Sequence, residues 1–158
     1  MWTDTRIRQV GGLLGTIVAV NIIGASPAFV IETETNWFDQ PPLYPPEILF
    51  PIVWTVLFSL MGIALWRLIR RRNRPGARRA LIVFGVQFLF NLAWTPLFFG
   101  LRQPGIALVV IVGLLGAIVL TIVTADRVDR TAALLLVPYL LWVGFATVLN
   151  TAIVIGWD

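Results

Sequence analysis

Two residue types that carry much of protein chemistry are missing from this chain of 158 residues, which contains no cysteine and no histidine. Without cysteine, the protein has no disulfide framework, no thiol nucleophile and no thiolate metal site. Without histidine, it cannot use serine–histidine or cysteine–histidine catalysis, a histidine zinc site or a proximal imidazole on haem. These absences exclude many hydrolase and metalloenzyme classes, and we expect neither a metal site nor a required cofactor.

Charged residues are also scarce, at 13% of the chain against 58% apolar residues, which leaves too few polar side chains to cover a water-soluble globule. Lysine is absent, so all 12 basic residues are arginines, and with 8 acids they give a formal charge of +4. Seven arginines lie between Arg67 and Arg79, beside an apolar run and without interleaved aromatic residues. This position is typical of a membrane-orientation signal, so we do not expect a nucleic acid as a partner.

Five apolar runs are long enough to cross about 30 Å of hydrocarbon as helices. They cover roughly residues 10–31, 48–69, 80–100, 105–125 and 131–155. The runs are continuous rather than alternating, which disfavours β-barrel strands, and their backbone must be hydrogen-bonded internally. The first run lacks a small-residue cleavage site, so we expect a retained span rather than a cleaved signal peptide. The sequence predicts an all-α membrane protein, a single domain over residues 1–158 that forms a five-helix bundle.

The connections between the runs differ in charge. The first connection has no basic residue and four acids, Glu32, Glu34, Asp39 and Glu47. The second connection carries six arginines around a Pro75-Gly76 turn. By the positive-inside rule, the N-terminus and the arginine-rich loop lie in the cytoplasm, and an odd number of spans leaves the C-terminus outside. We therefore expect a multi-pass protein of the cell membrane in this orientation.

The first connection is rich in proline, with four prolines among the six residues from Pro41 to Pro46. Proline removes backbone donors and fixes φ, so this loop is predicted to be semi-rigid and not helical. Its aromatic residues are Trp37, Phe38 and Tyr44. They either anchor the loop at the membrane surface or fold over the mouth of a cavity between the helices, and the sequence favours neither.

Polar and aromatic residues line up along single faces of the predicted helices. In the third run, Gln87, Asn91 and Thr95 are spaced by four residues, which places them on one face, with Trp94 alongside. Pro96 follows directly, and a proline at this position frees a backbone carbonyl and favours a kink. This face predicts a hydrogen-bonding wall that points into the bundle.

The fifth run repeats the spacing with Trp142, Ala146 and Asn150, and the second run adds Trp54 and Phe58. Three such faces would enclose an apolar pocket with a few polar groups, which is the usual composition of a small-molecule site. Alternatively, each amide hydrogen-bonds to a neighbouring helix and only holds the bundle together. Trp66, at the end of the second run, is typical of the aromatic belt at a membrane surface.

Four blocks of sequence occur in order between Trp37 and Asn150. They are WFD from Trp37, PPEILFPIVWT from Pro45, QxxxNxxWTPxFFG from Gln87 and PYxxWxxFATxLN from Pro138. At these blocks the chain resembles the translocator protein family, also called tryptophan-rich sensory proteins or peripheral-type benzodiazepine receptors. The resemblance covers most of the chain, and the order of the blocks on five apolar runs makes it specific.

The resemblance implies a bundle that is commonly a homodimer, with a ligand cavity between the helices and the proline-rich first loop over it. Family members bind porphyrins, haem and synthetic isoquinoline or benzodiazepine ligands, and animal members bind cholesterol. Some bacterial members are reported to degrade protoporphyrin in light through two tryptophans, which correspond to Trp54 and Trp142. The family's ligand cavity maps to Phe38, Pro46, Trp54, Phe58, Asn91, Trp94, Trp142, Ala146 and Leu149.

Three functions therefore remain open. The first is a tetrapyrrole-binding sensor or carrier, with a porphyrin or haem as ligand and membrane lipid around it. The second is a light-dependent protoporphyrin-degrading enzyme in which Trp54 and Trp142 donate electrons. The third is a small-molecule transporter, which the lack of intramembrane carboxylates disfavours. Sterol binding is unsupported, because none of the five residues after Tyr139 is Lys or Arg.

Overall fold

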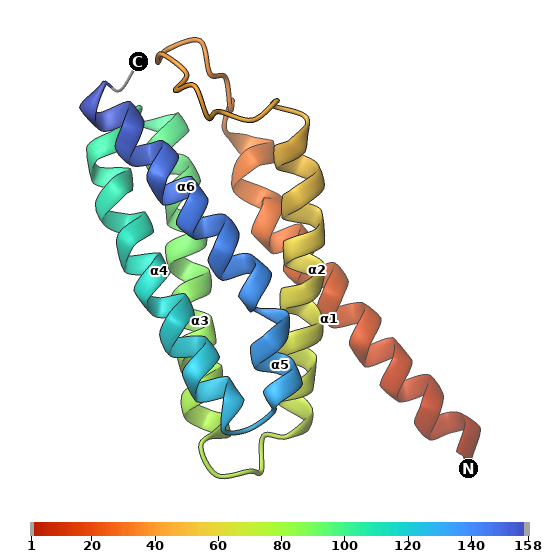
Figure 1. Cartoon of the computed structure of the whole chain (residues 1–158). Coiled ribbons are helices and arrows are strands. Elements are labelled where there is room, and N and C mark those ends of the chain that lie inside the picture. The colour runs from red at the N-terminus through yellow and green to blue at the C-terminus, as the bar shows by residue number, and fades with distance from the viewer. Residues whose placement is uncertain (1, 157–158) are drawn as a thin grey trace.

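The computed structural model describes residues 2–156, and this part of the chain consists of helices and loops without a strand (Figure 1). The helices are α1 (Trp2–Val30), α2 (Leu49–Arg70), α3 (Ala77–Thr95), the π-helical turn η1 (Pro96–Gly100), α4 (Pro104–Asp126), α5 (Arg130–Leu135) and α6 (Val137–Ile155). These helices form five spans that are long and apolar enough to cross a membrane. α3 and η1 together make one span, and α5 and α6 together make another. The prediction of an all-α membrane bundle with five spans is confirmed.

The two ends of the bundle carry different connections. The N-terminal end of α1 and the α2–α3 turn lie at one end, and the loop between α1 and α2 lies at the other end, near the end of α6 (Figure 1). α1 packs mainly against α2, and α3 packs mainly against α4, which also contacts α6. The N-terminal end of α1 projects away from the other helices (Figure 1), and apolar side chains of this part, such as Ile7 and Val10, are exposed.

The first helix is longer than its apolar run, because the polar segment before Val10 continues the helix back to Trp2. Pro27 lies inside α1 without ending it. Proline has no N–H to donate to the carbonyl four residues earlier, which here belongs to Ile23. The hydroxyl of Ser26 donates to that carbonyl oxygen instead, at 2.7 Å. This local replacement lets the helix continue to Val30.

Two glycines allow α1 and α2 to approach closely. A Cβ atom at Gly62 would lie 2.6 Å from the Cα atom of Ile17, so the two backbones meet at this point. A Cβ atom at Gly12 would lie 2.3 Å from the Trp66 ring, which therefore packs across α1. Small residues at helix crossings are the usual means of close packing in membranes.

The kink expected at Pro96 takes the form of η1. Pro96 cannot donate a helical hydrogen bond, and the N–H of Leu101 reaches back five residues to the Pro96 carbonyl at 2.9 Å. The wider turn carries the ring of Phe98 over Trp94, with the ring centroids 4.8 Å apart and the planes stacked at 20°. Proline thus shapes one wall of the bundle interior.

A single acid fixes the start of the fifth span. Asp129 is buried and caps α5, where its carboxylate accepts hydrogen bonds from the N–H groups of Thr131 at 2.9 Å and Ala132 at 3.2 Å. The same carboxylate forms ion pairs with Arg67 at 2.9 Å and Arg71 at 2.6 Å. The arginine-rich end of α2 is therefore tied to the α4–α5 corner, which was not expected from the charge-balanced sequence of this connection.

Candidate functional site

A cavity of about 440 Å³ lies inside the bundle. Its walls come from α1, α2, α3, η1, α4 and α6, and the α1–α2 loop contributes residues at one end. The volume falls in the range of small-molecule sites, which are largely apolar with a few polar groups. The amides and hydroxyls among its lining residues are Asn21, Thr33, Thr35, Tyr44, Thr55, Asn91, Thr95 and Asn150.

Seven of the nine residues predicted to form a ligand site line this cavity, namely Trp54, Phe58, Asn91, Trp94, Trp142, Ala146 and Leu149. Phe38 and Pro46 do not line it. Phe38 packs instead against the rings of Tyr44 and Phe98, and Pro46 is exposed and accepts a hydrogen bond from the N–H of Leu49 at 2.9 Å. The structure therefore brings together the predicted residues on the helices, and it leaves the two on the loop outside the lining.

Aromatic rings dominate two sides of the cavity. Trp54 lies against Phe58 with ring centroids 5.2 Å apart, and Trp142 lies edge-on to Phe50 at 5.8 Å. The stacked pair of Trp94 and Phe98 forms the wall on the α3–η1 side. Flat indole and phenyl faces of this kind suit the face of a planar aromatic ligand.

The aromatic residues of the α1–α2 loop pack on rings that belong to the cavity wall. Trp37 and Phe38 pack on the Phe98 ring, at 5.3 and 5.6 Å between centroids, and Tyr44 packs on Phe50 at 5.5 Å. Phe98 and Phe50 are themselves cavity-lining residues. Of the three loop aromatics, Tyr44 therefore lines the cavity itself, whereas Trp37 and Phe38 pack on a residue that lines it.

Hydrogen bonds between helices use the amides predicted on the third and fifth runs. The Nδ2 atom of Asn91 donates to the Tyr139 hydroxyl at 2.9 Å, and that hydroxyl donates to Oε1 of Gln87 at 2.9 Å. The indole N–H of Trp94 donates to Oδ1 of Asn150 at 3.1 Å. Gln87 lies outside the cavity and acts only between helices, whereas Asn91 and Asn150 both line the cavity and hold the helices together.

The amino-acid sequence that forms this cavity matches a known protein family. A model of the TspO/MBR family matches residues 14–155. The chain belongs to the TspO/MBR family. It is 43% identical over 147 residues to the tryptophan-rich protein TspO of Chlorobaculum tepidum, a match that covers 89% of this chain and 90% of that one.

Two further relatives come from a different bacterium and from an animal. The chain is 35% identical over 127 residues to the tryptophan-rich sensory protein of Cereibacter sphaeroides, with 78% of each chain covered. It is 36% identical over 128 residues to the translocator protein of Homo sapiens, with 77% of this chain and 75% of that one covered. Family membership and the five apolar helices together identify a multi-pass membrane protein.

One indole in the cavity of this TspO/MBR protein lacks a hydrogen-bond partner. The Nε1 atom of Trp142 is buried and has no acceptor within the described residues. A buried donor without a partner costs free energy. Because this atom is enclosed by protein atoms, Trp142 meets the cavity through its ring and not through its N–H.

The electrostatics of the cavity are set by its loop end. Glu47 is the one charged residue among the described lining residues, and it accepts a hydrogen bond from the Thr35 hydroxyl. Burial, with a smaller contribution from the charge of Glu47, raises the pKa of Tyr44 to about 12, so its phenol stays protonated and remains a donor. No arginine lines the cavity in residues 2–156, and no group of three or more carboxylates there is placed to hold a metal ion.

Several of these cavity residues were missed by reasoning from sequence. Phe50 and Phe98 carry ordinary aromatic side chains without a polar neighbour, and only the packing of the loop shows their role. Glu47 lies within the PPEILFPIVWT block, and its charge beside an apolar run was a usable signal. Asn21 interrupts the first run, and it both lines the cavity and donates to the Ser59 hydroxyl at 3.1 Å.

Proposed function

We propose that this protein binds a tetrapyrrole such as a porphyrin in the cavity and serves as a membrane sensor or carrier of that ligand. The observation that carries the proposal is the arrangement of Trp54, Trp94 and Trp142 around one apolar cavity of about 440 Å³. A porphyrin presents a large flat aromatic face, for which indole rings provide stacking contacts. The names of two relatives, a tryptophan-rich sensory protein and a translocator protein, support the sensor or carrier role.

The polar groups of the cavity indicate how such a ligand would be oriented. The hydroxyls of Thr33 and Tyr44 offer donors at the loop end, where the carboxylate edge of a porphyrin can reach polar surroundings. Glu47 at that end repels ligand carboxylates, so the fit depends on these neutral donors rather than on a basic residue.

Titration of the purified protein with protoporphyrin in the dark tests the proposal. We expect saturable quenching of tryptophan fluorescence, because a bound porphyrin lies beside several indoles. Trp142→Phe should weaken binding roughly threefold, because the phenyl ring offers a smaller stacking face than the indole. Trp66→Phe is the matched control, because Trp66 lies outside this cavity, and it should leave the affinity unchanged. Absence of saturable quenching would rule out the proposal.

A second candidate function is light-dependent degradation of protoporphyrin. It is favoured by the finding that Trp54 and Trp142 line the same cavity, so both indoles would contact one bound ligand. Illumination of the complex in the presence of oxygen separates the two candidates. Loss of the porphyrin absorption bands that requires both tryptophans would support the enzyme, whereas stable binding with an unchanged spectrum would support the sensor or carrier.

A further inference from the structure

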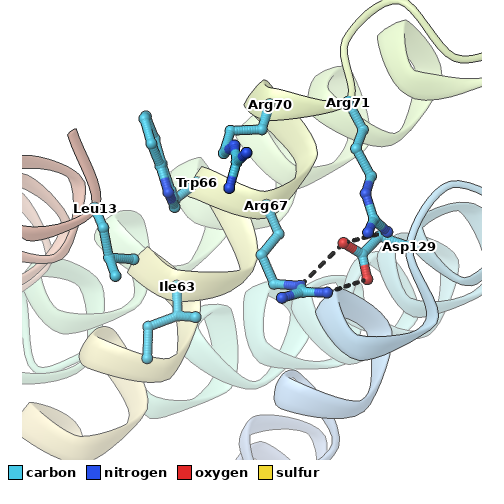
Figure 2. A pocket seen from close by; sticks show the side chains of 7 residues that line it. All are labelled: Leu13, Ile63, Trp66, Arg67, Arg70, Arg71 and Asp129. Carbon is cyan, nitrogen blue, oxygen red and sulfur yellow. Dashed lines mark hydrogen bonds and ion pairs between the residues drawn. The ribbon is translucent and has the colours of Figure 1, made fainter. Parts of the chain in front are cut away.

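A second pocket, of about 290 Å³, lies at the arginine-rich end of α2 (Figure 2). One residue of α1, Leu13, lines it together with residues from the end of α2 and with Asp129 from the α4–α5 corner; those from α2 and its C-cap are Ile63, Trp66, Arg67, Arg70 and Arg71. None of its residues lines the aromatic cavity. The pocket is therefore separate from the site described above.

The polar half of the pocket has an excess of positive charge. It contains Arg67, Arg70 and Arg71 against the single acid Asp129. Both oxygens of Asp129 are occupied, by two arginines and by two backbone N–H groups of α5, and its side chain is only 2% exposed. An additional anion therefore meets no available carboxylate to compete with, and it meets two arginine charges that Asp129 does not neutralise.

The arginines keep donors free for such an anion. The Arg70 guanidinium has no hydrogen-bond or ion-pair partner among residues 2–156, and it extends over the pocket between Trp66 and Arg67 (Figure 2). Arg67 and Arg71 are about one-third exposed, at 34% and 35% of the side chain, and each uses only part of its guanidinium on Asp129. Arginine matches phosphate oxygens with pairs of N–H groups.

The other half of the pocket is apolar. Leu13 of α1 and Ile63 and Trp66 of α2 line it, and the Trp66 ring is held against α1 by the close contact at Gly12. Beyond Leu13, the exposed face of α1 continues with the apolar side chains of Val10 and Leu14. A soluble phosphate would leave this apolar half uncovered, whereas a molecule with an acyl chain would fill it.

We propose that this pocket binds an anionic phospholipid, with its phosphate held by Arg67, Arg70 and Arg71 and its acyl chain packed along Leu13, Ile63 and Trp66. Basic pockets between membrane helices are suited to anionic lipid headgroups. Such a lipid contacts both α1, at Leu13, and α2, close to the point where the start of α1 leaves the bundle (Figure 1). This proposal is independent of the ligand in the aromatic cavity.

Fluorescence quenching by brominated lipids tests this proposal. The full chain is reconstituted in phosphatidylcholine vesicles that contain equal small fractions of either brominated phosphatidylglycerol or brominated phosphatidylcholine. We expect stronger quenching by the anionic lipid, and we expect the difference to disappear in Trp66→Phe, which removes the indole in the pocket. Arg70→Gln should weaken the preference for phosphatidylglycerol about fivefold, which is the size of one arginine charge near an anionic surface.

Arg78→Gln is the matched control, because Arg78 is exposed on the same end of the molecule and does not line the pocket. It should leave the preference unchanged. Equal quenching by the two lipids would overturn the proposal, and so would an effect of Arg78→Gln as large as that of Arg70→Gln. A third arm adds inorganic phosphate: displacement of the quenching by phosphate alone would identify a soluble anion site and reject the lipid.

Discussion

Two neighbouring aromatic residues on α6 have opposite roles at the scale of single residues. Tyr139 is fully buried, and its hydroxyl accepts from Asn91 and donates to Gln87. Trp142, one turn further along, has a buried N–H with no protein partner and lines the cavity. The first residue holds helices together through its hydroxyl, and the second presents its ring to the cavity.

Tyr139→Phe should therefore lower the free energy of unfolding by about 1–2 kcal/mol, because it leaves the amides of Gln87 and Asn91 without their shared partner. Ligand affinity should change little, since Tyr139 does not line the cavity. Titration with a denaturing detergent measures the stability. Trp142→Phe is the comparison, and it should show the reverse pattern, with the stability kept and the affinity reduced; a similar loss of stability in both variants would contradict this assignment.

Glu47 gives a second prediction at the residue scale, because it is the charged group at the loop end of the cavity. Glu47→Gln should strengthen binding of a dicarboxylate porphyrin roughly threefold, since it removes a like charge near the ligand carboxylates. The corresponding porphyrin diester, which has no charge, should bind equally to both proteins. Glu32 lies in the same loop but does not line the cavity. The Glu32→Gln variant should therefore bind the dicarboxylate porphyrin as tightly as the unaltered protein does.

At the scale of elements, the α4–α5 corner depends on one carboxylate. Burial alone would raise the pKa of Asp129, but hydrogen bonds from Arg67 and the Ala132 N–H, together with the charges of Arg67 and Arg71, outweigh burial and lower it. A pKa that is lower in the folded state means that the unfolded state binds the proton more tightly. The stabilisation is therefore complete above the ordinary value of 3.8 and is lost as the pH falls through the lowered pKa.

We expect a fall in stability on acidification in this range, measured by thermal unfolding at a series of pH values. Asp129→Asn keeps an oxygen that can cap α5 but loses the charge, so its stability should depend less on pH and be lower at neutral pH. Asp129→Ala also loses the cap and should cost about 1 kcal/mol more than Asp129→Asn. If both variants kept the full pH dependence, another group would be responsible.

The elements also show what the sequence could and could not predict. Continuous apolar runs placed four of the five spans within a few residues, because span length follows directly from hydrocarbon thickness. The sequence indicated a distortion at Pro96, but its form as a π-helical turn depends on the bond from Leu101 back to Pro96. The polar start of α1 was missed because hydropathy reports burial in lipid and does not report helix ends.

The residues of the candidate site could be predicted where helical spacing alone determines the direction of their side chains. Asn91 and Ala146 lie on the faces expected from a four-residue spacing, and both line the cavity. Phe38 and Pro46 are in a loop, where no periodicity fixes the direction of a side chain, and neither lines the cavity. Asp129 pairs with Arg67, which lies 62 residues away in sequence. No local sequence pattern reveals such a contact.

At the scale of the whole molecule, the fold fixes which connections share a side of the membrane. The loop between α1 and α2 lies at one end and the arginine-rich α2–α3 turn at the other (Figure 1). The positive-inside rule predicts that the arginine-rich end is cytoplasmic. Since the chain has no cysteine, a single introduced cysteine reports its own side without any background.

Leu43→Cys in the first loop and Asn73→Cys in the arginine-rich turn both replace exposed residues. A maleimide reagent that cannot cross membranes should label Leu43→Cys in intact cells and should label Asn73→Cys only after lysis. The unaltered chain is the control and should show no labelling. Labelling of Asn73→Cys alone in intact cells would reverse the orientation.

The aromatic lining of the cavity also determines how binding must be quantified. A ligand apolar enough to fill a space walled by indole and phenyl rings partitions strongly into the surrounding bilayer. The occupancy of the cavity is then governed by the mole fraction of ligand in the lipid, and the aqueous concentration is only an indirect measure of it. An apparent dissociation constant calculated from the total ligand per volume of sample will rise with the amount of lipid present, whereas one expressed as a mole fraction in the lipid will stay constant.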